Sequence, residues 1–132
     1  MDKLSKSPGF KKIFVIDDEE DLCFLLKVNL EETGSFKVFT CSRSTEAVAQ
    51  VKKVLPDLII SDILMPEISG PEIAKEVRAD KRTKDIPIIF LTSILREEEA
   101  EECKAVGKEH YVAKPVEVDE LVKKIKKIID LP

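Results

Sequence analysis

Short apolar runs alternate with amphipathic stretches along most of the chain. The runs are rich in β-branched and aromatic residues and have the length of strands; they cover residues 12–17, 36–40, 57–61, 88–92 and 109–113. The stretches that follow them place apolar residues three and four positions apart, as one face of a helix requires. This alternation predicts an α/β fold, with five strands in a parallel sheet and five helices over its two faces.

Residues at the ends of these segments predict where the helices begin. The first helix is expected over residues 18–32, and Ser44 is expected to cap the second. Ser69 is expected to cap the third helix in the same way. A very polar fourth helix is predicted over residues 96–106, and the most clearly amphipathic helix over residues 118–129.

The length and composition indicate one globular domain. The chain has 132 residues, for which we expect a loose tail over residues 1–10 and a single domain over residues 11–132. The net charge is −4 and no apolar run reaches the roughly 20 residues that cross a bilayer, so we expect neither nucleic acid nor a membrane as a partner. Three cysteines without CxxC spacing, and no visible signal peptide, indicate reduced thiols and a cytoplasmic location.

Acidic, hydroxyl and amino side chains stand at the ends of successive predicted strands. They are, in chain order, Asp17 and Asp18, Asp62, Thr92 and Lys114. Sites in open parallel sheets form at the carboxyl ends of the strands, so these side chains are expected to share one pocket. Carboxylates that lie close together raise each other's pKa or require a cation, and Mg²⁺ prefers such oxygen ligands. Because an ammonium group suits a phosphate oxygen, the set predicts phosphoryl transfer to or from a carboxylate.

Each of these signals also has a simpler interpretation. An acidic pair is usually a solvated helix start, and an aspartate that ends a strand is usually a turn residue. Thr92 could simply end its strand, and Lys114 could be an exposed loop residue before a proline. The functional interpretation therefore depends on finding all of these residues at the strand ends of one α/β pattern.

The spacing of the same residues matches a known family. The motif D-x-x-M-P-x-x-x-G begins at Asp62, 44 residues after Asp18; Thr92 follows 30 residues later and Lys114-Pro115 a further 22 residues on. In these motifs the chain resembles the receiver domains of bacterial two-component response regulators, over nearly its whole length. The resemblance implies a flavodoxin-like (βα)5 three-layer sandwich with strand order 2-1-3-4-5.

The resemblance also implies a role for each residue of the site. Asp62 would accept a phosphoryl group from the phosphohistidine of a histidine kinase or phosphotransfer protein, and the domain would catalyse only its own phosphorylation and dephosphorylation. Asp18, Asp62 and the carbonyl of Leu64 would hold Mg²⁺, or Mn²⁺ in its place, and Asp17 would reach the ion directly or through water. Lys114 would pair with the phosphoryl group, and its peptide bond to the following proline would be cis.

Thr92 and Tyr111 would form the conformational switch of the family. On activation Thr92 would shift toward the phosphoryl oxygen, and the Tyr111 ring would move into the space that it leaves. The simpler interpretation of Tyr111 is a half-buried strand tyrosine.

The face of residues 96–129, with an acidic segment at 96–102 and a basic one at 123–127, would change on activation and pair two copies as a homodimer when phosphorylated. A solvated helix face is the simpler interpretation of that acidic segment.

Other functions compete with this one. A haloacid dehalogenase-like phosphatase also uses an aspartyl nucleophile, but it needs a second aspartate two residues later, where this chain has Leu64. A flavodoxin needs a phosphate loop where this chain has the acids of residues 17–21, which would repel phosphate. The receiver is the expected function and the phosphatase the alternative.

In the resembling family, the residues at positions 64 and 94 border the path of the water that hydrolyses the phosphoryl group. Here they are Leu64 and Ile94, and neither side chain can orient a water, so we expect a long-lived phosphoryl group.

Overall fold

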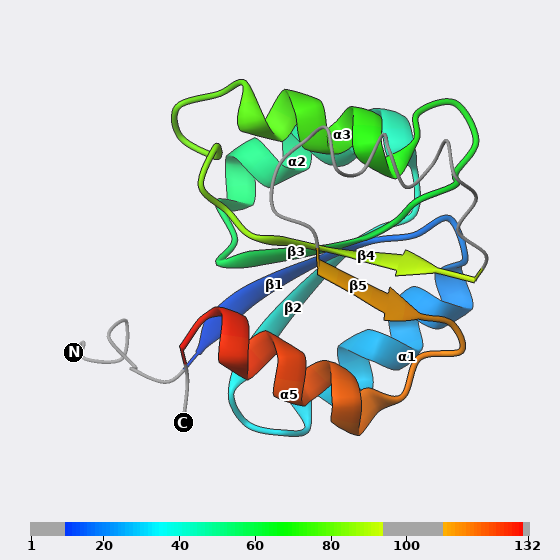
Figure 1. Ribbon diagram of the computed structural model, residues 1–132, viewed down its shortest axis with the longest axis vertical. Helices are drawn as coiled ribbons and strands as arrows, with labels where there is room; N and C mark the ends of the chain where they lie inside the picture. The colour runs from blue at the N-terminus through cyan, green and yellow to red at the C-terminus, as the bar shows by residue number, and fades with distance from the viewer. Residues whose placement is uncertain (1–9, 94–109, 131–132) are drawn as a thin grey trace.

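The five predicted strands form one parallel sheet. The computed structural model describes residues 10–93 and 110–130, and the strands lie in the order β2-β1-β3-β4-β5 (Figure 1). Their bounds are β1 (Lys11–Ile16), β2 (Phe36–Cys41), β3 (Leu58–Asp62), β4 (Ile88–Thr92) and β5 (His110–Ala113). All neighbouring strands pair in parallel. The α/β fold and the strand order 2-1-3-4-5 are therefore confirmed.

Helices cover both faces of this sheet. Figure 1 shows α1 (Glu20–Glu31) and α5 (Val118–Ile128) on one face, and α2 (Ser44–Val54) and α3 (Gly70–Arg78) on the other. Because both faces are covered, the central strands β1, β3 and β4 are buried along most of their length, and their side chains enter two separate cores. The fourth predicted helix, residues 96–106, lies outside the described residues.

The two predicted serine caps have different outcomes. Ser69 caps α3 as predicted: its Oγ accepts the N–H of Glu72 at 3.2 Å, and the Glu72 carboxylate accepts the Ser69 N–H at 2.8 Å. The prediction for Ser44 is wrong, because Arg43 is the N-cap residue and Ser44 is already inside α2. The Ser44 hydroxyl instead donates to the Pro66 carbonyl at 2.7 Å, so it ties α2 to the loop after β3.

Two boundaries near the strand ends also differ from the prediction. The first helix begins at Glu20 rather than residue 18, because Oδ1 of Asp17 accepts the Glu19 N–H at 2.9 Å and bends the chain first. Asp62 is the last residue of β3, opposite Leu91 of β4, and does not follow the strand. Backbone pairing therefore holds Asp62 directly on the sheet.

Smaller predictions are also settled within the described residues. Cys23 and Cys41 are buried free thiols, and burial raises the pKa of Cys23 to about 12, as suits an inert core residue; Cys103 lies outside the described residues. The peptide bond between Lys114 and Pro115 is cis. In the part of the chain that the structure describes, no helix combines the length and the apolar character needed to cross a membrane.

Candidate functional site

The predicted site residues converge at the carboxyl edge of the sheet. Asp17 follows β1, Asp62 and Thr92 end β3 and β4, and Lys114 follows β5. One carboxylate oxygen from each of Asp17, Asp18 and Asp62 lies within 4.8 Å of the other two. The chain order of the strands separates these residues by tens of positions, and only the 2-1-3-4-5 arrangement brings their ends together.

Lys114 lies among three carboxylates. Its Nζ is 3.1 Å from Oδ2 of Asp17, 3.5 Å from Oδ2 of Asp62 and 3.3 Å from Oε1 of Glu19. Its backbone N–H donates to the carbonyl of Thr92 at 2.9 Å, which fixes the residue at the end of β4. Sequence reasoning missed Glu19, because an exposed acid at the start of a helix has no distinguishing local pattern.

Burial and mutual repulsion perturb the acids of the site. Asp17 is fully buried, and the Asp62 side chain is 12% exposed. Burial raises the pKa of Asp62 to about 6, and the charge of Asp17 adds to the rise while Lys114 opposes it. Burial also raises the pKa of Asp17, although the Glu19 N–H and Lys114 favour its charged form. One ammonium group therefore does not fully compensate the buried carboxylates.

Gly70 explains part of the motif after Asp62. Its N–H donates to the Ile63 carbonyl at 2.8 Å, so the start of α3 packs directly against the end of β3. A Cβ atom at this position would overlap the backbone carbonyl of Asp62. The absence of a side chain is thus what allows the start of α3 to lie this close to the end of β3.

A small cavity opens beside Asp62. It has a volume of about 90 Å³, room for several waters or one small oxyanion, and is lined by Asp62, Ile63, Leu64, Leu91, Thr92, Ser93 and Lys114. Leu64, although 56% exposed, is one of these lining residues. The structure thus places Leu64 and Thr92 beside the candidate nucleophile; Ile94 lies outside the described residues.

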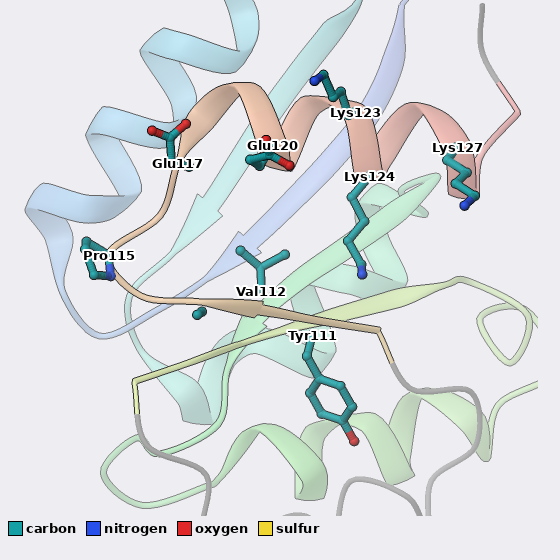
Figure 2. A pocket seen from close by; sticks show the side chains of 9 residues that line it. Tyr111, Val112, Pro115, Glu117, Glu120, Lys123, Lys124 and Lys127 are labelled. Atoms are coloured by element: carbon teal, nitrogen blue, oxygen red, sulfur yellow. The ribbon is translucent and has the colours of Figure 1, made fainter.

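Tyr111 lies farther along β5, on the face covered by α2 and α3. Its ring centroid is 6.2 Å from that of Phe90 on β4. Figure 2 shows Val112 pointing toward α5, whereas the Tyr111 ring points to the opposite face of the sheet. A groove of about 540 Å³ follows β5 and α5; its charged lining is acidic at Glu117 and Glu120 and basic farther along α5, at Lys123, Lys124 and Lys127.

Together, the strand order and the convergent acids define a flavodoxin-like α/β domain with an acidic, lysine-containing site. Residues 13–126 match the response regulator receiver domain, and the chain belongs to this family of signalling domains. It is similar to chemotaxis protein CheY4 of Vibrio cholerae, whose solved structure has a TM-score of 0.84, 32% identity, and coverage of 91% of this chain and 99% of that chain. The confirmed family leaves the haloacid dehalogenase-like alternative without support.

Two curated relatives illustrate the range of the family. The phosphate regulon transcriptional regulatory protein PhoB of Rhizobium meliloti is 40% identical over 118 residues, which are 89% of this chain and 52% of that protein. A 14.6 kDa protein of Leptolyngbya boryana, described as uncharacterized, is 35% identical over 84% of both chains. The chain spans about half the length of several of the curated relatives that it matches.

The donor set fits a hard divalent cation. Asp17, Asp18 and Asp62 supply carboxylate oxygens at mutual distances that one ion can bridge, and Mg²⁺ is bound through such oxygens together with waters. A bound dication would also remove the unfavourable charge of the buried pair Asp17 and Asp62, whose pKa values are both raised without it. The cluster is therefore a candidate magnesium site, as the family typically has.

Proposed function

We propose that Asp62 is the phosphoacceptor of this receiver domain, and that the domain takes its phosphoryl group from a histidine kinase or phosphotransfer protein in the cytoplasm. A carboxylate oxygen of Asp62 attacks phosphorus, the bond from phosphorus to the histidine nitrogen breaks, and an acyl phosphate forms. The single observation that carries the proposal is the convergence of Asp17, Asp18, Asp62 and Lys114 around one small cavity.

Each neighbour of Asp62 has a distinct task in this proposal. Asp18, Asp62 and the Leu64 carbonyl would hold Mg²⁺, with Asp17 reaching it directly or through water and Mn²⁺ able to substitute. The ion would neutralise charge on the phosphoryl oxygens. Lys114 donates to a phosphoryl oxygen, which requires it to exchange carboxylate partners that it contacts at 3.1 to 3.5 Å. Asp62 attacks as a carboxylate, so protonation at low pH blocks the reaction.

The position of Lys114 supports a proposal for the conformational switch and for the partner surface. Its backbone bond to Thr92 joins the site to the ends of β4 and β5, so a shift of Thr92 toward the phosphoryl group can be passed along β5 to Tyr111. The groove in Figure 2 lies on this path, and we include the face of residues 96–129 in the proposal as a homodimer surface of the phosphorylated form. Sedimentation with beryllofluoride, a mimic of the phosphoryl group, tests for the dimer, and an unchanged monomer mass would contradict it.

The domain itself is proposed to span residues 11–132, after a tail of residues 1–10.

Labelling with a small phosphodonor tests the central proposal. The protein is incubated with acetyl phosphate and Mg²⁺, and intact mass is measured before and after treatment with hydroxylamine, which cleaves acyl phosphates. One hydroxylamine-labile phosphoryl group is expected, and it should be lost when the metal is chelated. Asp62→Asn should abolish it, whereas Asp57→Asn, which changes an exposed acid at the other end of β3, should not. Full labelling of the Asp62→Asn variant would place the nucleophile elsewhere.

A further inference from the structure

Glu19 contacts the site without belonging to its buried part. Its side chain is 64% exposed, yet its Oε1 accepts a hydrogen bond from Nζ of Lys114 at 3.3 Å. The Lys114 side chain is 18% exposed and lines the cavity beside Asp62, so the contact joins an exposed acid to a residue of the cavity. Glu19 is the N-cap residue of α1 but makes no side-chain capping bond, which leaves its carboxylate available to Lys114.

The three partners of Lys114 are not equivalent. Asp17 is held by its own bond to the Glu19 N–H, and Asp62 is held by β3, so both carboxylates are fixed relative to the sheet. Glu19 reaches the same ammonium group with a largely exposed side chain, and it is the least constrained of the three carboxylates. An oxyanion that binds beside Asp62 must share or replace these contacts, since an ammonium group has only three donors.

We propose that Glu19 is a positioning residue that competes with the phosphoryl group for Lys114 and thereby slows phosphorylation. This inference rests on the proposed function and adds a regulatory contact to the same site. The Glu19 carboxylate and the phosphoryl oxygens compete for the donors of the Lys114 ammonium group. Releasing Lys114 from Glu19 therefore favours any anionic occupant of the cavity.

The effect has a bounded size. Exposed ion pairs contribute roughly 0.2–1 kcal/mol, so Glu19→Gln should accelerate phosphorylation and tighten beryllofluoride binding by about 1.4- to fivefold. The acceleration should be larger with acetyl phosphate than with the less highly charged phosphoramidate, because more negative charge is brought to Lys114. Beryllofluoride binding is an equilibrium measurement and reports on the contact without any chemical step.

Two matched variants separate the contact from simpler effects. Asp21→Asn removes the same charge from an exposed neighbouring position of α1, outside the contacts of Lys114 described here. Glu19→Asp keeps the charge but withdraws the carboxylate by one methylene, and aspartate is well tolerated at an N-cap. The proposal expects Glu19→Asp to resemble Glu19→Gln, and Asp21→Asn to resemble the wild type, with thermal melts showing that all variants fold.

The outcomes are distinct. No change in Glu19→Gln would overturn the proposal, and equal acceleration in Glu19→Gln and Asp21→Asn would assign the effect to the general negative field. A Glu19→Asp variant that behaves as the wild type would show that charge, and not the contact, matters, and would also overturn it. If the wild type itself takes no phosphoryl group and binds no beryllofluoride, the proposed function fails, whatever the variants do.

Discussion

The two ends of the neighbouring strands β1 and β3 use charged residues in opposite ways. At the amino end, the Asp57 carboxylate accepts the Lys12 N–H at 2.8 Å, and the Asp57 N–H donates to the Lys12 carbonyl at the same distance. At the carboxyl end, Asp17 and Asp62 are buried close together and share one ammonium group, that of Lys114. The same sheet thus satisfies an exposed acid fully at one end and crowds two buried acids at the other.

This difference separates an end whose charged groups are satisfied from an end whose charged groups are not. The exposed pair of Lys12 and Asp57 closes the ends of the strands and needs no further ligand. The buried acids gain from any added positive charge or bound proton, because burial opposes their charged form. Substitutions at equivalent places on the two ends should therefore differ in size or even in sign.

The largest expected effect is steric and compares the two glycines nearest these ends. Gly70→Ala should destabilise the protein by about 3 kcal/mol, because the new Cβ meets the fixed backbone of Asp62 rather than a movable side chain. Gly34→Ala, near the amino end, has open space but a φ of +83°, so it should cost about 1–2 kcal/mol. Urea unfolding measures both values. Equal costs would show that the carboxyl end can relax around the added methyl group.

The next comparison changes sign between the ends. In metal-free protein at pH 7–8, Asp62→Asn should stabilise the fold by up to about 3 kcal/mol, because a buried charge held unfavourably is removed. Asp57→Asn should instead destabilise it by about 1 kcal/mol, through the weakened bond to the Lys12 N–H.

The pH dependence of the Asp62 effect is fixed by the direction of its pKa. A pKa of about 6 in the folded protein, raised from 3.8, means that the folded state binds the proton more tightly than the unfolded state. The wild type therefore loses stability as pH rises from about 4 to about 6, and the advantage of Asp62→Asn should vanish near pH 4. Thermal melts across this range, in a chelator, measure it. A destabilised Asp62→Asn variant at neutral pH would contradict the crowding of charge at this end.

The affinity for Mg²⁺ should depend on pH, because the buried acids at the carboxyl end also bind protons. Protons and the cation compete for Asp62, so the Mg²⁺ affinity should fall by up to about tenfold for each pH unit below about 6. Calorimetric titration at several pH values measures this slope. The Asp57→Asn variant serves as the control and should follow the wild-type slope; a flat profile through pH 6 would mean that the site does not hold a proton there.

The smallest expected effect concerns the two exposed leucines that stand near these ends. Leu64 lines the cavity beside Asp62, so Leu64→Asn, which can orient a water, should speed loss of the phosphoryl group by about two- to tenfold. Leu55 is 43% exposed and precedes β3 at the amino end, and Leu55→Asn should leave that rate unchanged. Dephosphorylation followed by mass spectrometry measures both. A rate unaffected by Leu64→Asn would show that this side chain does not control access of water.

The sequence pattern predicted the strands and the described helices to within two residues at the bounds that it gave. It also predicted that Asp17, Asp62 and Lys114 would lie together. Strand ends carry unusual polar residues against an apolar background, so Asp62 and Lys114 are conspicuous. The order of the strands was implied by the family resemblance, because periodicity shows which segments are strands but not which of them are neighbours. Glu19 and Ser44 were missed or misassigned, since acids and hydroxyls near helix starts have local uses that hide a long-range contact.

The Ser44 hydroxyl has a consequence for the exchange of segments between related proteins. It donates to the Pro66 carbonyl and accepts the Ile68 N–H at 3.3 Å, so one side chain of α2 satisfies two backbone groups in the loop after Asp62. A chimera that imports α2 from a relative would therefore import the anchoring of that loop as well. Threonine preserves the hydroxyl, whereas alanine leaves the Pro66 carbonyl and the Ile68 N–H with their bond to each other, at 2.8 Å, but without the tie to α2. In such transplants, position 44 helps to hold the loop beside the candidate site, even though its described hydrogen bonds reach none of the acids.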